Sequence, residues 1–253
     1  MVKNMNEFLV EYKKQQHLYV WLIPIVFLAV LFLWGTAGQR NLSDYDLAQG
    51  YSYLLCQTPV LNCILMPIML AVISSRICDI ECKGQTWNLL FTLQKKGRFY
   101  DRKFLTELLY LLLFCLGEMA MFLLYGTLLG YTEPLPGILF LRHFAATVLA
   151  GIAVLTLQHI LSLLSANQII PLLTGLAGSF IGLFSEFFPY TFARLVLWNY
   201  FAAFAPYSIG WDETDKEVLL TARAFPTRLF IGFMVFTLLF YILCRYIFIK
   251  RER

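Results

Sequence analysis

Six long apolar runs, each separated from the next by a shorter polar or aromatic segment, dominate the sequence. We predict that they form membrane-spanning helices over residues 18–35, 51–75, 104–130, 142–165, 168–188 and 228–249. A bilayer core of about 30 Å requires about 17 to 25 apolar residues per helix, which these runs supply. The runs do not alternate between apolar and polar residues, as barrel strands would. The pattern therefore predicts an all-α membrane protein with six transmembrane helices.

Composition and charge agree with this prediction and orient the chain. Hydrophobic residues make up 59% of the sequence and charged residues 14%, whereas soluble domains average about 45–50% and about 25%. Of the 20 Lys and Arg residues, 14 lie on the side that holds both termini and residues 76–103. Positive residues favour the cytoplasmic side, so we predict that both termini are cytoplasmic. A cleaved signal peptide is the alternative for the first run, which closes with the small residues Gly35 and Ala37, but its removal would place the charges of one terminus on the wrong side.

Residues 1–17 precede the first run and have an amphipathic pattern. Met5, Phe8, Leu9 and Tyr12 fall on one face at helical spacing. This spacing predicts an interfacial helix that lies on the inner leaflet. A short frayed tail is the alternative.

Residues 189–227 form the longest extracellular connection. The first part is too apolar for an exposed loop, is rich in aromatic residues and contains Pro189 and Pro206. Aromatic side chains favour the membrane interface. We therefore predict one or two short re-entrant helices, followed by an exposed acidic piece over residues 212–217.

Residues 76–103 form the polar cytoplasmic segment between the second and third spans. Apolar residues recur in it at roughly helical intervals: Ile77, Ile80, Trp87, Leu90 and Phe91. After Leu93 the segment becomes strongly basic. A loop that only meets anionic lipid is one interpretation. A solvated loop has no reason to keep Trp87 and Phe91 together, which favours an amphipathic helix that binds another protein.

The same segment carries a motif that resembles a known family. It reads Glu-x-Lys-Gly-x-Thr-Trp over Glu81, Lys83, Gly84, Thr86 and Trp87, and a basic stretch leads to Lys103 at the start of the third span. With six spans and an amino-terminal amphipathic helix, the chain resembles the permease subunit of ABC-2-type exporters. Within that group it is similar to bacterial permeases that give immunity or resistance to lantibiotics and related peptide antibiotics.

The resemblance implies a division of labour between subunits. A separate ATP-binding cassette ATPase would bind ATP and Mg²⁺, and this chain, which has no Gly-x-x-x-x-Gly-Lys-Ser/Thr motif, would need no cofactor and would not be an enzyme. The resemblance further implies a second permease subunit of the same or a related kind, a peptide antibiotic as substrate, membrane lipid but no nucleic acid as a further partner, and a multi-pass location in the bacterial plasma membrane. The residues expected at the ATPase-coupling interface are Glu81, Lys83, Gly84, Thr86, Trp87, Leu90 and Phe91.

Polar residues inside the spans are a second group of candidates. Glu118 lies near mid-depth of the third span, where an ionised carboxylate is costly. Asn62 lies at a similar depth in the second span and is within reach of a hydrogen bond. A structural bond between them, contact with a cationic peptide, and a protonated carboxyl group with no special role all remain open. His159, near the inner end of the fourth span, is expected to be satisfied by a neighbouring group.

Small residues and cysteines add two further expectations. Gly175, Gly178 and Gly182 follow one another at helical spacing in the fifth span and predict close helix packing, within the chain or across a dimer. Cys78 and Cys82 have the spacing of a metal half-site, but with no histidine nearby in the sequence we expect them only to pack.

Two other classes of function compete with a transporter. An intramembrane enzyme requires convergent catalytic groups, and we expect no such cluster because His17 and His143 are predicted at opposite membrane surfaces. A sensor or scaffold subunit that binds an ATPase without transport is the other alternative.

Overall fold

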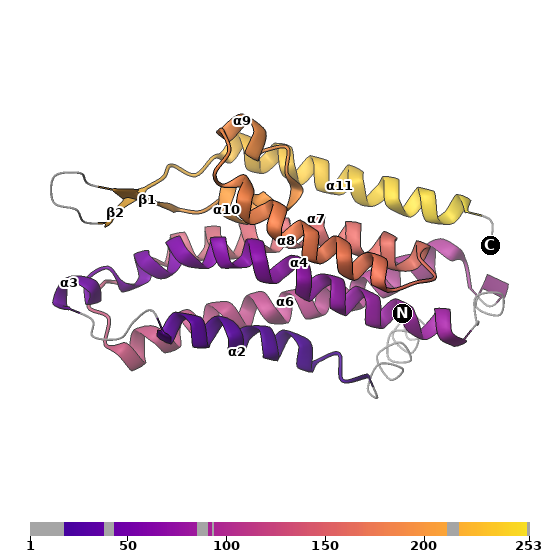
Figure 1. Ribbon diagram of the computed structural model, residues 1–253, viewed down its shortest axis with the longest axis horizontal. Helices are drawn as coiled ribbons and strands as arrows, with labels where there is room; N and C mark the ends of the chain where they lie inside the picture. The colour runs from indigo at the N-terminus through magenta and orange to yellow at the C-terminus, as the bar shows by residue number, and fades with distance from the viewer. Residues whose placement is uncertain (1–17, 38–42, 85–90, 93, 212–217, 252–253) are drawn as a thin grey trace.

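A computed structural model describes residues 18–37, 43–84, 91–92, 94–211 and 218–251. Long helices that run roughly side by side form most of it (Figure 1). Four of them are long and apolar enough to cross a membrane: α4 (Gly50–Gly84), α6 (Lys96–Leu129), α7 (Gly137–Leu164) and α11 (Thr227–Lys250). The apolar helices α2 (Leu22–Ala37) and α8 (Ile169–Ser185) are shorter, with 16 and 17 residues. The six predicted runs are therefore all helical. The predicted interfacial helix over residues 1–17 lies outside the described residues.

The helices are unequally buried, which separates a core from a periphery. The most apolar stretch of α4 is 61% buried, and those of α7 and α6 are 56% and 44% buried, whereas that of α11 is 17% buried. A helix that is apolar on its exposed faces is typical of contact with lipid. Helices α4, α6 and α7 therefore form the core, and α11 presents most of its surface outward.

Two helices extend beyond their predicted ends into the polar segment. Helix α4 continues past Ser75 to Gly84, and α6 begins at Lys96. The prediction of a separate coupling helix that starts at Arg76 is therefore wrong for residues 76–84. Ile77 and Cys78 are fully buried, so the packing that supports the helix continues through this stretch. Residues 85–90 and 93 lie outside the described part of the chain.

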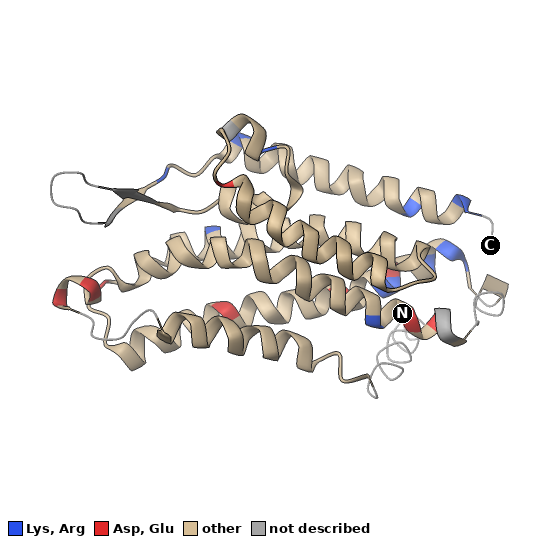
Figure 2. Cartoon of the chain, viewed as in Figure 1, with Lys and Arg blue, Asp and Glu red and all other residues tan. Residues whose placement is uncertain are grey.

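Lys and Arg residues gather at one end of the molecule, where α6 begins and α11 ends (Figure 2). We call this the basic end. It includes Lys95, Lys96, Arg98, Arg245 and Lys250. The opposite end, called here the hairpin end, carries the short helix α3 (Asp44–Leu47) and a two-stranded sheet (Figure 1).

The connection before α11 differs from its prediction. Three short helical turns follow Pro189, where one or two short helices were predicted: α9 (Tyr190–Ala193), η2 (Leu197–Asn199) and α10 (Tyr200–Ala203). They are followed by the antiparallel strands β1 (Tyr207–Trp211) and β2 (Val218–Ala222), in which Tyr207 pairs with Ala222. The fold is thus helical with one added hairpin, and the predicted acidic piece at residues 212–217 lies outside the described residues.

Glycines in α8 allow close contacts inside the chain. A side chain at Gly175 would meet the Pro67 carbonyl oxygen of α4 at 2.8 Å, and Gly178 and Gly182 make room for Trp198. Close approach of this kind is what small residues permit between membrane helices. The predicted small-residue face of α8 therefore packs within the chain.

Candidate functional site

Three charged side chains of α6 point into the core and are fully buried. Lys103, Glu107 and Glu118 each have no exposed surface. Their spacings of one and about three helical turns place them on one face of α6. Groups from α4 and α7 neutralise or hydrogen-bond each of them, and these contacts define the candidate site.

Glu118 lies between α4 and α7. Its two carboxylate oxygens accept hydrogen bonds from Asn62 Nδ2 at 3.1 and 3.3 Å. His143 Nε2 lies 2.7 Å from Glu118 Oε1, and Thr147 Oγ1 lies 3.5 Å from the same ring nitrogen. Asn62 and Glu118, which the sequence placed at a similar depth, are thus in contact, and His143 contacts the same carboxylate.

His143 corrects an expectation from the sequence. It was placed at a membrane surface, away from any cluster, but it is 3% exposed and contacts the Glu118 carboxylate. The reason is that α7 begins at Gly137 rather than at residue 142, so His143 lies more than a turn inside the helix. A carboxylate and a histidine therefore do meet within the core.

Glu107 forms a second carboxylate and histidine contact nearer the basic end. His159 Nδ1 lies 2.9 Å from Glu107 Oε1, and Ser74 Oγ donates to Oε2 at 2.9 Å. Cys78 Sγ approaches Oε1 at 3.7 Å. The His159 ring packs edge-on against Tyr100, with ring centroids 4.5 Å apart. His159 was expected to contact a neighbouring polar group, and that group is the Glu107 carboxylate of helix α6.

Cys78, Glu107 and His159 also form a potential metal-binding group. Their ligand atoms all lie within 4.8 Å of one another. One sulfur, one oxygen and one nitrogen are ligands that zinc accepts. No histidine lies near Cys78 in the sequence, but α7 brings His159 to it across the core. The side chain of Cys82 lies outside the described residues.

Lys103 joins α6 to the end of α4. Its Nζ lies 3.5 Å from Glu81 Oε1 and donates to the Ile77 carbonyl oxygen at 3.0 Å. The ring centroid of Phe99 lies 5.3 Å from the same nitrogen. Both charged side chains are buried, so Glu81 lies at an internal helix contact rather than on an exposed surface.

These clusters lie within the part of the chain that matches a known protein family. The sequence model of the family described as ABC-2 family transporter protein matches residues 8–182, which is more than half of the chain. The chain belongs to the ABC-2 transporter family. No curated protein and no solved structure gives a significant match. Members of this family are membrane components of ABC transporters, and residues 183–253, with the hairpin and α11, lie outside the matched region.

The predicted coupling residues of this ABC-2 protein are only partly described. Gly84 ends α4 and is exposed. Phe91 packs on Phe99 and Phe248, with ring centroids 6.1 and 6.3 Å apart, and Lys96 Nζ lies 5.1 Å from its centroid. Thr86, Trp87, Leu90 and the side chain of Lys83 lie outside the described residues.

A further ion pair at the basic end was not anticipated. Arg245 of α11 donates to both carboxylate oxygens of Asp101, at 2.6 and 2.9 Å, and the Tyr241 hydroxyl donates to the same group at 2.8 Å. A bidentate arginine pair fixes orientation as well as distance. The ABC-2 protein thus links its peripheral helix α11 to α6 next to the segment that joins α4 and α6.

Sequence reasoning overlooked Glu107, Asp101 and Arg245. Glu107, like Glu118, is a carboxylate in an otherwise apolar run. The spacing of the two residues could have predicted that they lie on the same face of α6. Asp101 and Arg245 gave no comparable signal, because nothing in the sequence indicates that the start of α6 lies beside the end of α11.

Proposed function

We propose that this ABC-2 protein is the permease subunit of an exporter that spans the bacterial plasma membrane six times. Helices α4, α6, α7 and α11 span it fully, and α2 and α8 complete the six spans, although at about 1.5 Å per residue each covers about 25 Å. The excess of Lys and Arg at the basic end supports a cytoplasmic position for that end and for both termini.

Energy for transport comes from a separate ATP-binding cassette subunit in this proposal. That subunit binds ATP and Mg²⁺, and family membership of the chain supports the partnership. A second permease subunit, of the same or a related kind, encloses the pathway. The segment between α4 and α6 docks on the ATPase, with Trp87, Leu90 and Phe91 as its apolar anchors.

The observation that carries the proposal is the buried Glu81–Lys103 pair. It ties α4 to α6 through one residue that precedes the proposed docking segment in the sequence and one that follows it. Separating two buried opposite charges is costly, so the two helix ends move as a unit. The Glu107 cluster then extends this connection to α7. Displacement of the segment by the ATPase is thereby transmitted to the three core helices.

The proposed substrate is a peptide antibiotic of the lantibiotic type or a similar amphiphile, and its expulsion gives self-immunity or resistance. This part rests on the sequence resemblance around residues 81–87. A membrane sensor that binds the ATPase without transport is the second candidate. An intramembrane enzyme is disfavoured because members of the family are transporter components.

Copurification tests the coupling proposal. The chain is expressed together with the products of its neighbouring genes, purified through a tag on the permease, and examined for a bound ATPase. We expect Trp87→Ala with Phe91→Ala to reduce recovery of the ATPase at least about tenfold, since aromatic anchors dominate interface energy. Trp34→Ala, on the exposed surface of α2, is the matched control and should leave recovery unchanged. Normal recovery and normal peptide tolerance in the double variant would contradict the proposal.

Transport itself is tested by reconstitution of the complex in vesicles. Peptide-stimulated ATP hydrolysis with loss of peptide from the membrane supports an exporter. Hydrolysis or complex formation without movement of peptide supports the sensor.

A further inference from the structure

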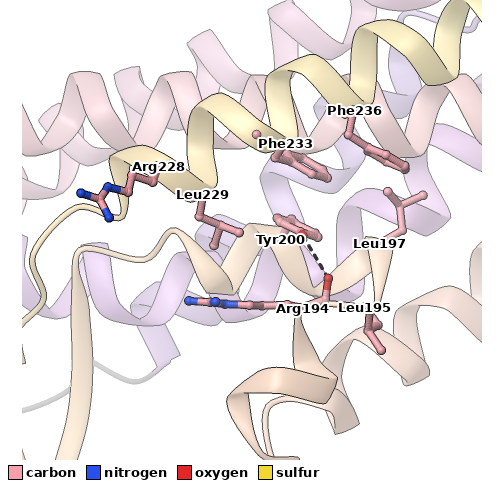
Figure 3. Close-up of a pocket in the computed structure, with 9 residues that line it drawn as sticks. Arg194, Leu195, Leu197, Tyr200, Arg228, Leu229, Phe233 and Phe236 are labelled. Carbon is pink, nitrogen blue, oxygen red and sulfur yellow. Dashed lines mark hydrogen bonds between the residues drawn. The ribbon is translucent and has the colours of Figure 1, made fainter.

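A hollow of about 410 Å³ lies between the start of α11 and residues 194–200, outside the part of the chain that defines the family. Leu195 and Leu197 form one wall, and Phe233 and Phe236 of α11 form the other (Figure 3). Leu195 is 80% exposed and Phe236 47% exposed. The hollow is thus an open, apolar groove on the surface of the bundle.

One end of this groove is basic. Arg194 and Arg228 line it, and both also line a second hollow of about 640 Å³ that continues past Thr227. Figure 3 shows both guanidinium groups on the same side of the groove, with Leu197 and Phe236 toward the other side. The groove therefore has a cationic end and an apolar end.

The walls are held together before any ligand binds. The Tyr200 ring stacks on Phe233, with centroids 3.7 Å apart and planes inclined by 8°. The Tyr200 hydroxyl donates to the Arg194 carbonyl oxygen at 3.0 Å. These contacts fix the segment that carries Arg194 against α11, so the two arginines keep their relative positions.

The depth of the groove matches the layers of a bilayer. Arg228 is in the first turn of α11, and Phe233 and Phe236 lie about 8 to 12 Å further along the helix at about 1.5 Å per residue. If α11 spans the membrane, its first turn lies at the interface where lipid phosphates are found, and the two phenylalanines lie at the level of the acyl chains. Arginine binds phosphate oxygens in a bidentate manner.

We propose that this groove binds an anionic phospholipid of the outer leaflet. Its phosphate lies between Arg194 and Arg228, and one acyl chain follows Leu195, Leu197 and Phe236. Two guanidinium groups exceed the charge of one phosphate, so a headgroup that lacks an ammonium group is preferred. The proposal goes beyond the proposed function and rests on it for one point, that α11 spans the membrane with its first turn on the outer side.

Lipid binding by the full chain tests the site without the ATPase, so its outcome is independent of transport. The protein is placed in nanodiscs of phosphatidylcholine with a small fraction of phosphatidylglycerol, and retained lipids are counted by native mass spectrometry after detergent exchange. We expect enrichment of phosphatidylglycerol on the wild-type chain and at least about tenfold weaker enrichment for Arg194→Gln with Arg228→Gln. If the double variant does not fold, each single variant carries the test and is expected to lose at least about threefold.

Controls separate the site from general charge and from free phosphate. Arg223→Gln removes an exposed positive charge five residues before Arg228 in the sequence. It should leave the enrichment of phosphatidylglycerol unchanged. Soluble glycerophosphate should not displace the lipid, because it lacks the acyl chain. Equal enrichment in wild type and double variant, an equal loss in Arg223→Gln, or displacement by glycerophosphate would each overturn the proposal.

Discussion

The two buried pairs of carboxylate and histidine in the core have the same components but different surroundings. In each, α6 supplies the carboxylate and α7 the histidine: Glu118 meets His143, and Glu107 meets His159. In the Glu118 cluster the Asn62 amide donates to the carboxylate, and Thr147 and the Phe122 ring lie beside His143. The Glu107 cluster has a hydroxyl and a thiol from α4, an aromatic wall, and the Glu81–Lys103 pair one turn away.

This difference indicates that the clusters serve different parts of the molecule. The Glu107 cluster ties all three core helices together beside the segment that we propose contacts the ATPase. The Glu118 cluster lies further along the bundle, with no buried ion pair between Lys and a carboxylate next to it in the described residues. We infer that loss of Glu107 disturbs coupling and folding together, whereas Glu118 contributes to helix register and to the transport pathway.

The largest expected effect is that of Glu107→Ala. It leaves His159 and Ser74 buried without their hydrogen-bond partner, and each buried polar group that loses its partner costs about 1–3 kcal/mol. We expect a larger fall in the melting temperature of the purified protein than for Glu118→Ala, as measured by intrinsic fluorescence in detergent. Glu133→Ala, which loses hydrogen bonds to Ser52 at the hairpin end, is the control and should have a small effect. Equal falls for the two core variants would remove the distinction between the clusters.

A double-mutant cycle sharpens the role of the neighbouring ion pair. Lys103→Met removes the cation beside the buried Glu81 carboxylate, with an expected cost of about 3 kcal/mol, whereas Lys103→Met with Glu81→Met should recover most of that stability. If the pair transmits movement, the double variant should fold and bind the ATPase but hydrolyse ATP without transport. Normal transport by a folded double variant would contradict the proposed transmission.

Replacement of Glu118 by Gln gives a smaller effect that separates its possible roles. The amide keeps an oxygen for Asn62 and a donor for His143, so the cost should be about 1 kcal/mol, below that of Glu118→Ala. A structural role predicts nearly normal peptide tolerance. Loss of tolerance with preserved stability would indicate contact with a cationic substrate, and equal destabilisation by Gln and Ala would rule out a purely hydrogen-bonding role.

The smallest effect is expected for Cys78→Ala. The thiol is a weak donor, and its contact with Glu107 is 3.7 Å long, so we expect a cost below about 1 kcal/mol beyond the lost packing. Zinc content of the purified chain, measured by inductively coupled plasma mass spectrometry, should not change. A fall in bound zinc would show that Cys78, Glu107 and His159 hold a metal ion.

The positions of the apolar helices were the most predictable part of the fold. All six apolar runs are helical, because a long apolar segment in a membrane satisfies its backbone groups in no simpler way. Their ends were less predictable at the polar segment. Glu81 was expected at the coupling interface and Lys103 at the start of the third span, but the two side chains are buried against each other, and this pairing lets α4 and α6 extend into the segment.

The candidate site was predictable in one pair of residues and not in the rest. Asn62 and Glu118 were matched by depth, which the rise per residue of a helix supplies. His143 was misplaced because a shift of five residues in the start of α7 moves a side chain by more than one turn. The hairpin of β1 and β2 was missed because short strands in a long connection have no strong periodicity.

The sequence by itself determined that the chain is a helical membrane protein, where its apolar helices lie, and that its positive charges gather at one end. Apolar segments and positive charges are sorted by their interactions with lipid and water, so their locations can be predicted from the amino-acid sequence alone. Only the tertiary structure decided which polar groups meet: Glu107 with His159, Asp101 with Arg245, and the two arginines beside the apolar groove. Such contacts depend on the rotation and tilt of each helix, which are set by the packing of side chains distant in the sequence.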